Sequence, residues 1–106
     1  MWNVKGNTLE MVVGDFGIDL PITVTDTTLT ASDTLRFTFK DATTGNTILE
    51  KEYDKISQNT VQLSLTRAES ELFKVGDYVY RLDWYQEGHF MCNVIPIDTF
   101  RVVAKA

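Results

Sequence analysis

The chain has 106 residues, 43% of them hydrophobic and 24% charged, with a formal net charge of −5. This length and composition predict a single folded domain over residues 1–106 and exclude an intrinsically disordered chain. The negative charge argues against nucleic-acid binding, and apolar runs of only a few residues argue against membrane insertion.

The N-terminal half of the chain alternates apolar and polar residues, which predicts β-strands. The first such stretch includes Leu9, Met11 and Val13. Segment 16–24 alternates most regularly and predicts a strand with one buried and one solvent-facing side. Pro21 cannot donate to a strand ladder, so we expect this strand at a sheet edge or a bulge.

The middle of the chain continues the same pattern. A polar connection, 26–33, leads to a strand with inward-facing apolar residues at alternate positions of 35–39. Segment 41–46 contains Gly and Asn and predicts a hairpin turn. The returning strand, 47–53, carries charges typical of a protected sheet edge. A further short strand is expected within 59–65.

The C-terminal third begins with a helix signal. Thr66 and Glu69 have the spacing of a capping box, which predicts a short helical turn near 67–74. The next strand should place four residues inward: Tyr78, Tyr80, Leu82 and Trp84. Segment 86–89 predicts a hairpin tip.

The final strands return from that tip. We expect Phe90, Cys92 and Val94 to face inward, Pro96 to interrupt the run, and 99–103 to form the last strand. About seven to nine short strands with regular turn signals and one helical turn predict an all-β, immunoglobulin-like antiparallel β-sandwich.

Thiol and histidine chemistry has little basis in this chain. Cys92 is the one cysteine and His89 the one histidine, so an intrachain disulfide or a Cys/His zinc site cannot form. We expect Cys92 to be a small core residue, since free cysteines are usually buried. A nucleophilic role would need a nearby base, and an offset of three places His89 on the opposite face of a strand.

Carboxylate pairs are the other candidates for chemistry. Three pairs have even spacing, so their members could share a strand face: Asp15 with Asp19, Glu50 with Glu52, and Asp77 with Asp83. We expect all three on solvated surfaces, although Asp15 and Asp19 leave open a weak calcium site. The sequence therefore predicts no enzyme, no catalytic residue, no metal site and no cofactor.

Aromatic residues offer a binding alternative. Trp84, Tyr85, His89 and Phe90 surround one hairpin, where they are either core residues or a ligand platform. Tyr85 has the strongest case for exposure, because it alternates with the inward-facing positions. Trp2 belongs to an apolar N-terminal segment that we expect to pack against its own sheet or a neighbouring subunit.

Residues 76–80, Gly-Asp-Tyr-Val-Tyr, resemble the tyrosine corner of immunoglobulin-like domains. Tyr78 holds the corner position, so its hydroxyl should bond to the preceding turn. Tyr80 stands where antibody domains have their second disulfide cysteine. Phe37 or Phe39 would replace the core tryptophan, which is absent from segment 35–39.

A second resemblance spans nearly the whole chain. It starts with Gly-Asp-Phe-Gly at 14–17 and Leu-Arg-Phe-Thr-Phe-Lys-Asp at 35–41. It continues with the strand at 61–66, the short helix and the tyrosine corner, and ends with Pro-Ile-Asp-Thr-Phe-Arg-Val at 96–102. This order resembles the immunoglobulin-like module of phage and prophage structural proteins, similar to the N-terminal domain of the siphophage baseplate upper protein.

The resemblance implies a non-catalytic assembly part of a phage tail or baseplate. Its partners would be other virion or tail subunits, or copies of itself in a symmetric oligomer. Residues 1–6 lack a signal-peptide pattern, which suits a virion component assembled in the bacterial cytoplasm. The alternatives are a carbohydrate-binding or adhesin-type module using Tyr85, and an accessory domain of an enzyme.

Overall fold

The computed structural model describes residues 1–106 except residues 1, 18, 26, 57 and 106, and it describes residues 2–5 by their backbone alone. The described elements are the strands β1 (Trp2–Lys5), β2 (Thr8–Val12), β3 (Leu20–Thr23), β4 (Asp33–Asp41), β5 (Thr47–Tyr53), β6 (Thr60–Leu63), β7 (Gly76–Gln86) and β8 (His89–Val103), and the helix α1 (Arg67–Ser70).

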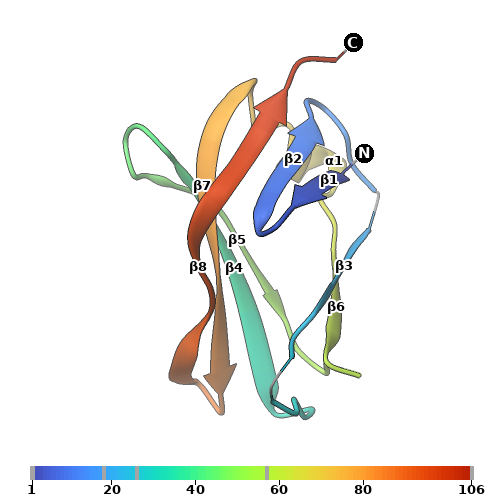
Figure 1. The fold of residues 1–106 in the computed structure, drawn as a ribbon, viewed down its shortest axis with the longest axis vertical. Coiled ribbons are helices and arrows are strands. Elements are labelled where there is room, and N and C mark those ends of the chain that lie inside the picture. Colours follow the sequence, from blue (N-terminus) through green and yellow to red (C-terminus); the bar gives the residue numbers. More distant parts are fainter. Residues whose placement is uncertain (1, 18, 26, 57, 106) are drawn as a thin grey trace.

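The strands form two sheets that face one another (Figure 1). The large sheet has six strands in the order β1-β2-β8-β7-β4-β5, and the small sheet pairs β3 with β6. This arrangement confirms the predicted all-β sandwich. The expected antiparallel pairing fails at one place, because β2 and β8 run parallel. Nearly the whole domain separates these two strands in sequence, which allows the crossover that a parallel pair requires.

The core lies between the sheets and contains the predicted inward-facing residues. Leu35, Phe37 and Phe39 on β4 are 0% exposed, as is Leu82 on β7. Aromatic rings are concentrated at the centre of the core, where Phe39 lies 5.1 Å from Phe100 between ring centroids. Alternation along β4 and β7 therefore predicted the buried faces correctly.

The strand expected over 16–24 is shorter than predicted. β3 begins only at Leu20, and Phe16 is 50% exposed rather than buried. Gly14 and Gly17 adopt positive φ angles of 85° and 73°, so the chain turns repeatedly before it becomes extended. The expected position of Ile18 lies outside the described residues. β3 pairs with β6 alone among the described strands, which confirms the edge position predicted for Pro21.

The helix signal is confirmed, although the helix is short. Thr66 accepts a hydrogen bond from the Glu69 backbone N–H at 3.2 Å, and the Glu69 carboxylate accepts one from the Thr66 N–H at 2.8 Å. The helix ends at Ser70, and beyond Glu71 the N–H groups bond three residues back: Leu72 donates to the Glu69 carbonyl at 3.1 Å and Phe73 to the Ser70 carbonyl at 3.2 Å. This tight turn directs Phe73 into the core, where it is 3% exposed.

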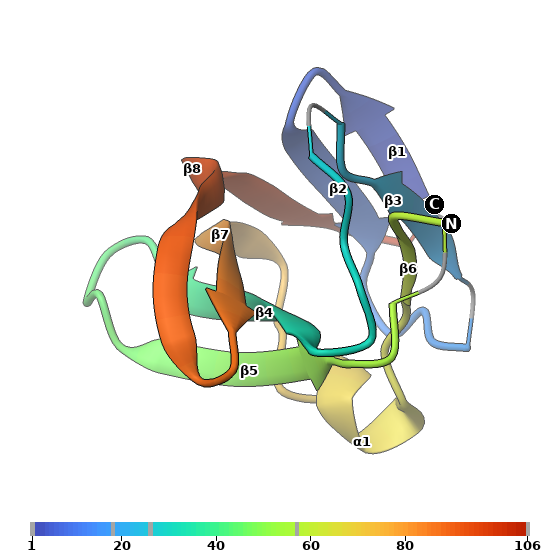
Figure 2. The same ribbon diagram turned by 90° about the horizontal axis from the view of Figure 1, so that it is seen from below.

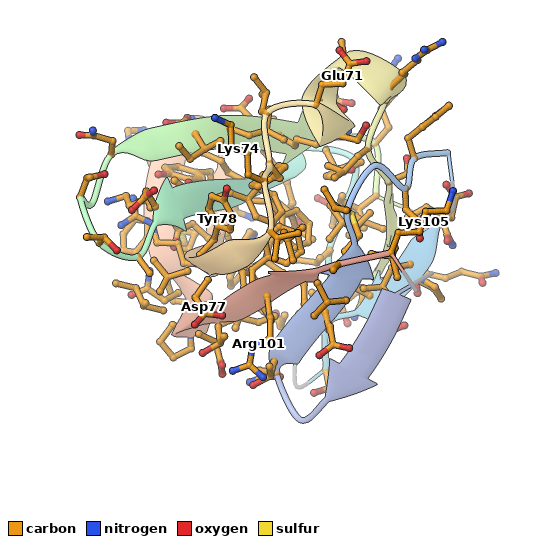
Figure 3. The ribbon with its side chains drawn as sticks, turned by 90° about the horizontal axis from the view of Figure 1, so that it is seen from above. Glu71, Lys74, Asp77, Tyr78, Arg101 and Lys105 are labelled. Atoms are coloured by element: carbon orange, nitrogen blue, oxygen red, sulfur yellow. The ribbon has the colours of Figure 1, made fainter. Side chains whose placement is uncertain are left out.

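The tyrosine corner is present. Tyr78 is 8% exposed, and its hydroxyl oxygen accepts a hydrogen bond from the Lys74 backbone N–H at 2.9 Å (Figure 3). The bond fixes the loop between α1 and β7 to the start of β7. Tyr80 is 1% exposed, so its aromatic ring belongs to the core.

We expect Tyr78→Phe to lower the free energy of unfolding by about 1 kcal/mol, since it removes one hydrogen bond and keeps the ring. Urea unfolding followed by circular dichroism would measure the change. Tyr85→Phe is the matched control, because the Tyr85 hydroxyl bonds to the partly exposed Arg36 side chain rather than to a backbone group. Equal stability of wild type and Tyr78→Phe would contradict a structural role for the corner.

The return strand β8 departs most from the predicted pattern. It runs unbroken through Pro96, but its register against β7 shifts at three places. One shift inserts Met91 between the positions paired with Trp84 and Tyr85. An inserted residue moves the following side chains to the other face. Consequently Phe90, predicted to be inward, lies opposite Tyr85 and is 54% exposed. Cys92 keeps the inward side opposite Trp84, but it is exposed rather than the buried core residue that was predicted.

None of the described helical residues form a helix long and apolar enough to cross a membrane.

Candidate functional site

A groove lies between the two sheets on the described surface. It has two connected parts, of about 640 Å³ and about 340 Å³, which share Asn7, Ile22 and Ile95. We call it the inter-sheet groove. Its further lining residues come from β2, β3, β7, β8 and the adjoining loops: Gly6, Leu9, Leu20, Pro21, Thr23, Val24, Thr25, Thr27, Tyr80, Trp84, Cys92, Asn93 and Val94. None of these residues is charged at neutral pH.

One wall of the groove is β3, which has a paired edge and a free edge. Ile22 lies opposite Val61 of β6, and the next even-numbered residue, Val24, donates its N–H to the Asn59 carbonyl at 2.8 Å. Backbone groups of successive strand residues point to opposite edges. The backbone N–H and C=O of Thr23 therefore point away from β6, towards the groove. Figure 2 shows β6 on the α1 side of the small sheet and β3 on the side of the β1–β2 hairpin.

The opposite wall carries Trp84, which a buried carboxylate holds in place. Asp33, 1% exposed, accepts a hydrogen bond from the Trp84 indole N–H at 3.0 Å and one from the Thr30 backbone N–H at 2.6 Å. Burial raises the pKa of Asp33, but these hydrogen bonds outweigh burial and leave the pKa below its usual range. Trp84 itself is half-buried, so it belongs partly to the core and partly to the groove. In the sequence Asp33 was only the last residue of a polar connection, so its role in holding Trp84 was not predicted.

The floor of the narrower part contains Tyr80. Its hydroxyl donates a hydrogen bond to the Asn7 carbonyl, which attaches the β1–β2 turn to the large sheet. Burial, with a further contribution from Asp98, raises the pKa of Tyr80 to about 12. The hydroxyl therefore remains a donor across the physiological pH range.

We expect this bond to make the domain sensitive to alkali. The folded-state pKa of Tyr80, about 12, lies above the ordinary tyrosine pKa of 10.0. Its contribution to stability is therefore complete below pH 10 and falls as the pH rises towards about 12. Thermal melts between pH 8 and 12 should show a smaller alkaline loss for Tyr80→Phe than for wild type. Parallel curves for the two proteins would contradict the assignment.

The hairpin aromatics that the sequence grouped together lie on two faces. Trp84 lines the groove, whereas Tyr85 packs edge-on against Phe90, with 5.7 Å between ring centroids, on the other face of the large sheet. The Arg36 guanidinium lies 4.4 Å from the centre of the Tyr85 ring. The expected exposure of Tyr85 is only partial, because Arg36 and Phe90 cover it. The side chain of Trp2 lies outside the described part of the chain.

Two of the predicted carboxylate pairs have clearly different surroundings in the structure. Asp83 is 2% exposed rather than solvated, and it accepts hydrogen bonds from the side chains of Arg81, at 3.0 Å, and Asn93. Asp77 is exposed and forms an ion pair with Arg101 at 3.1 Å (Figure 3). Glu50 and Glu52 are exposed as expected and flank Arg36.

The exposure of Asp15 and Asp19 bears on the weak calcium site that the sequence left open. Asp19 is exposed and Asp15 is partly buried. Among the described residues, no group of three or more His, Cys, Asp or Glu side chains could hold a metal ion. The described geometry thus offers surfaces for binding.

Comparison of the chain with protein-family models, curated proteins and solved structures finds no match.

Proposed function

We propose that this domain is a non-catalytic assembly module that binds another protein chain in the inter-sheet groove. The observation that carries the proposal is the uncharged groove beside the free edge of β3. A strand edge offers backbone donors and acceptors, and the apolar wall supplies area to bury, so the combination suits a polypeptide partner.

The setting we propose is a phage or prophage particle, as part of a tail or baseplate assembled in the bacterial cytoplasm. The support for this setting is the order of sequence motifs from the loop at 14–17 to the strand at 96–102. The partners would be other virion subunits or further copies of the domain.

Size-exclusion chromatography with light scattering, from micromolar to near-millimolar protein, tests the assembly proposal. We expect a defined symmetric oligomer such as a trimer or hexamer. A monomer at every concentration, together with saturable binding of a glycan, would overturn the proposal in favour of a ligand-binding module.

A carbohydrate-binding or adhesin-type module is the second candidate, and the exposed Phe90 beside Tyr85 and Arg36 favours it. Sugar rings stack on exposed aromatic rings, and the guanidinium could donate to hydroxyl groups. Titration of a glycan panel, with Tyr85→Ala as the loss variant and Trp84→Phe as the control on the other face, would detect such binding.

A further inference from the structure

We propose that the inter-sheet groove is a vacant strand position, which an extended, uncharged segment of a partner chain fills by pairing with the free edge of β3. This inference depends on the proposed assembly function and specifies the chemistry of its partner. A third strand in the small sheet would cover the part of the large sheet that β3 and β6 leave open.

The small sheet is incomplete for a sandwich of this kind. In constant-type immunoglobulin domains the corresponding sheet has four strands, and the first strand of the chain pairs with the outer edge of the second. Here β1 and β2 form a hairpin that extends the large sheet beyond β8. The place beside β3 is left as the groove. An isolated pair of strands is marginally stable, so a third strand would add stability as well as contacts.

The backbone of β3 limits where a partner strand can bond. Pro21 has the same orientation as Thr23 but no N–H, so it offers the groove only a carbonyl. Proline at an edge discourages uncontrolled strand addition. Thr23 offers both its backbone N–H and its backbone C=O. Thr25, two residues further along the same side of the chain, lines the wider part of the groove. The partner strand should therefore bond chiefly around Thr23.

The two parts of the groove predict the side chains of the partner. The wider part, about 640 Å³, is bounded by Trp84, Val24 and Val94, and the narrower part, about 340 Å³, by Tyr80 and Leu9. Alternate side chains of one strand point to the same face and lie about 7 Å apart. A partner with a large apolar residue at one inward position and a smaller aliphatic residue two positions away would fill both parts.

The charge pattern predicts a neutral partner segment. The chain is 24% charged, yet no described lining residue is Asp, Glu, Lys or Arg. A charged side chain entering this groove would lose hydration without gaining an ionic partner. The polar lining groups are hydroxyls and amides, such as those of Thr23, Thr27 and Asn93, which suit a peptide backbone and neutral side chains.

The test uses the full chain and the peptide acetyl-Lys-Thr-Val-Thr-Phe-Thr-Val-Thr-Lys-amide, whose terminal lysines lie outside the groove. Nuclear magnetic resonance would follow the Thr23 amide and its hydrogen exchange. Fluorescence of a Trp2→Phe background would report on Trp84. We expect saturable binding, slower exchange at Thr23 and a shifted Trp84 emission.

Two controls separate strand pairing from general apolar binding. A peptide methylated on its Phe amide nitrogen keeps the side chains but loses a backbone donor, and we expect it to bind at least about tenfold more weakly. Thr23→Pro should weaken binding similarly, whereas Gln62→Pro, whose backbone points to the opposite edge of the small sheet, should not. The methylated peptide keeps the test valid if Thr23→Pro fails to fold.

Absence of saturable peptide binding, equal affinity for the methylated peptide, or unchanged exchange at Thr23 would each overturn the inference. If light scattering still shows a defined oligomer, the assembly proposal stands and another face must form the contact. If both fail, the domain is not an assembly module of the kind proposed.

Discussion

Replacing Phe39 with alanine should lower the free energy of unfolding by about 3–5 kcal/mol, which approaches the total stability of many small domains. Phe39 is 0% exposed, and its ring lies 5.7 Å from that of Phe73 and 5.1 Å from that of Phe100. These rings connect the large sheet to the turn after α1. Truncation removes the apolar contacts and leaves a cavity that a rigid β-sandwich can fill only in part.

Urea unfolding monitored by fluorescence and circular dichroism would measure this loss. Phe90→Ala is the matched control, because the same change at a side chain that is 54% exposed should alter stability far less. Phe39→Leu should lie between wild type and Phe39→Ala. Comparable unfolding midpoints for Phe39→Ala and Phe90→Ala would contradict the position of the aromatic core.

Alternation of apolar and polar residues predicted the fold wherever the chain keeps strict register. On β4 and β7, nine consecutive residue pairs from Asp33–Gln86 to Asp41–Tyr78 align without a shift, so the buried faces followed directly from the sequence. The capping box at Thr66 and the corner at Tyr78 were equally predictable, since both depend on residues close together in the chain.

β8 shows why the buried and exposed residues in the rest of the large sheet could not be predicted from the sequence. Its inserted residues become visible only when it is aligned against β7, and each one reverses the side of the sheet that the following residues face. The exposure of Phe90 follows from one of those insertions. Cys92 stays on the side of Trp84 and is exposed because it lines the open inter-sheet groove. Pro96 lies at one of the shifts, where its missing N–H does not interrupt the ladder.

The groove was not predictable for a different reason. It exists because the β1–β2 hairpin pairs with β8 rather than with β3, and that choice is made between segments about 90 residues apart. Apolar residues on β3 and β8 predict burial equally well whether a third strand covers them or not. The sequence therefore indicated Ile22 and Val94 as inward residues without showing that part of their surface lines an open groove.

Asp33→Ala should lower the free energy of unfolding by about 3 kcal/mol, because it removes two hydrogen bonds to a charged group. The donors are the Thr30 backbone N–H, at 2.6 Å, and the Trp84 indole N–H, at 3.0 Å. Both donors would lose a buried partner, and Trp84 would lose the contact that fixes its ring against the groove. Asp33→Asn is the matched variant, because it keeps an acceptor oxygen and should cost less.

The pH dependence of stability distinguishes the effect of the Asp33 charge from the effect of the shape of its side chain. Hydrogen bonds hold the pKa of Asp33 below the ordinary aspartate value of 3.8. The contribution of Asp33 to stability is therefore complete above a pH of about 4 and falls as the carboxylate protonates. Wild type should therefore lose more stability than Asp33→Asn between pH 5 and pH 2. Trp84 emission in a Trp2→Phe background should shift with Asp33→Ala at neutral pH. An unshifted spectrum, with equal acid sensitivity of wild type and Asp33→Asn, would show that Asp33 does not position the groove wall.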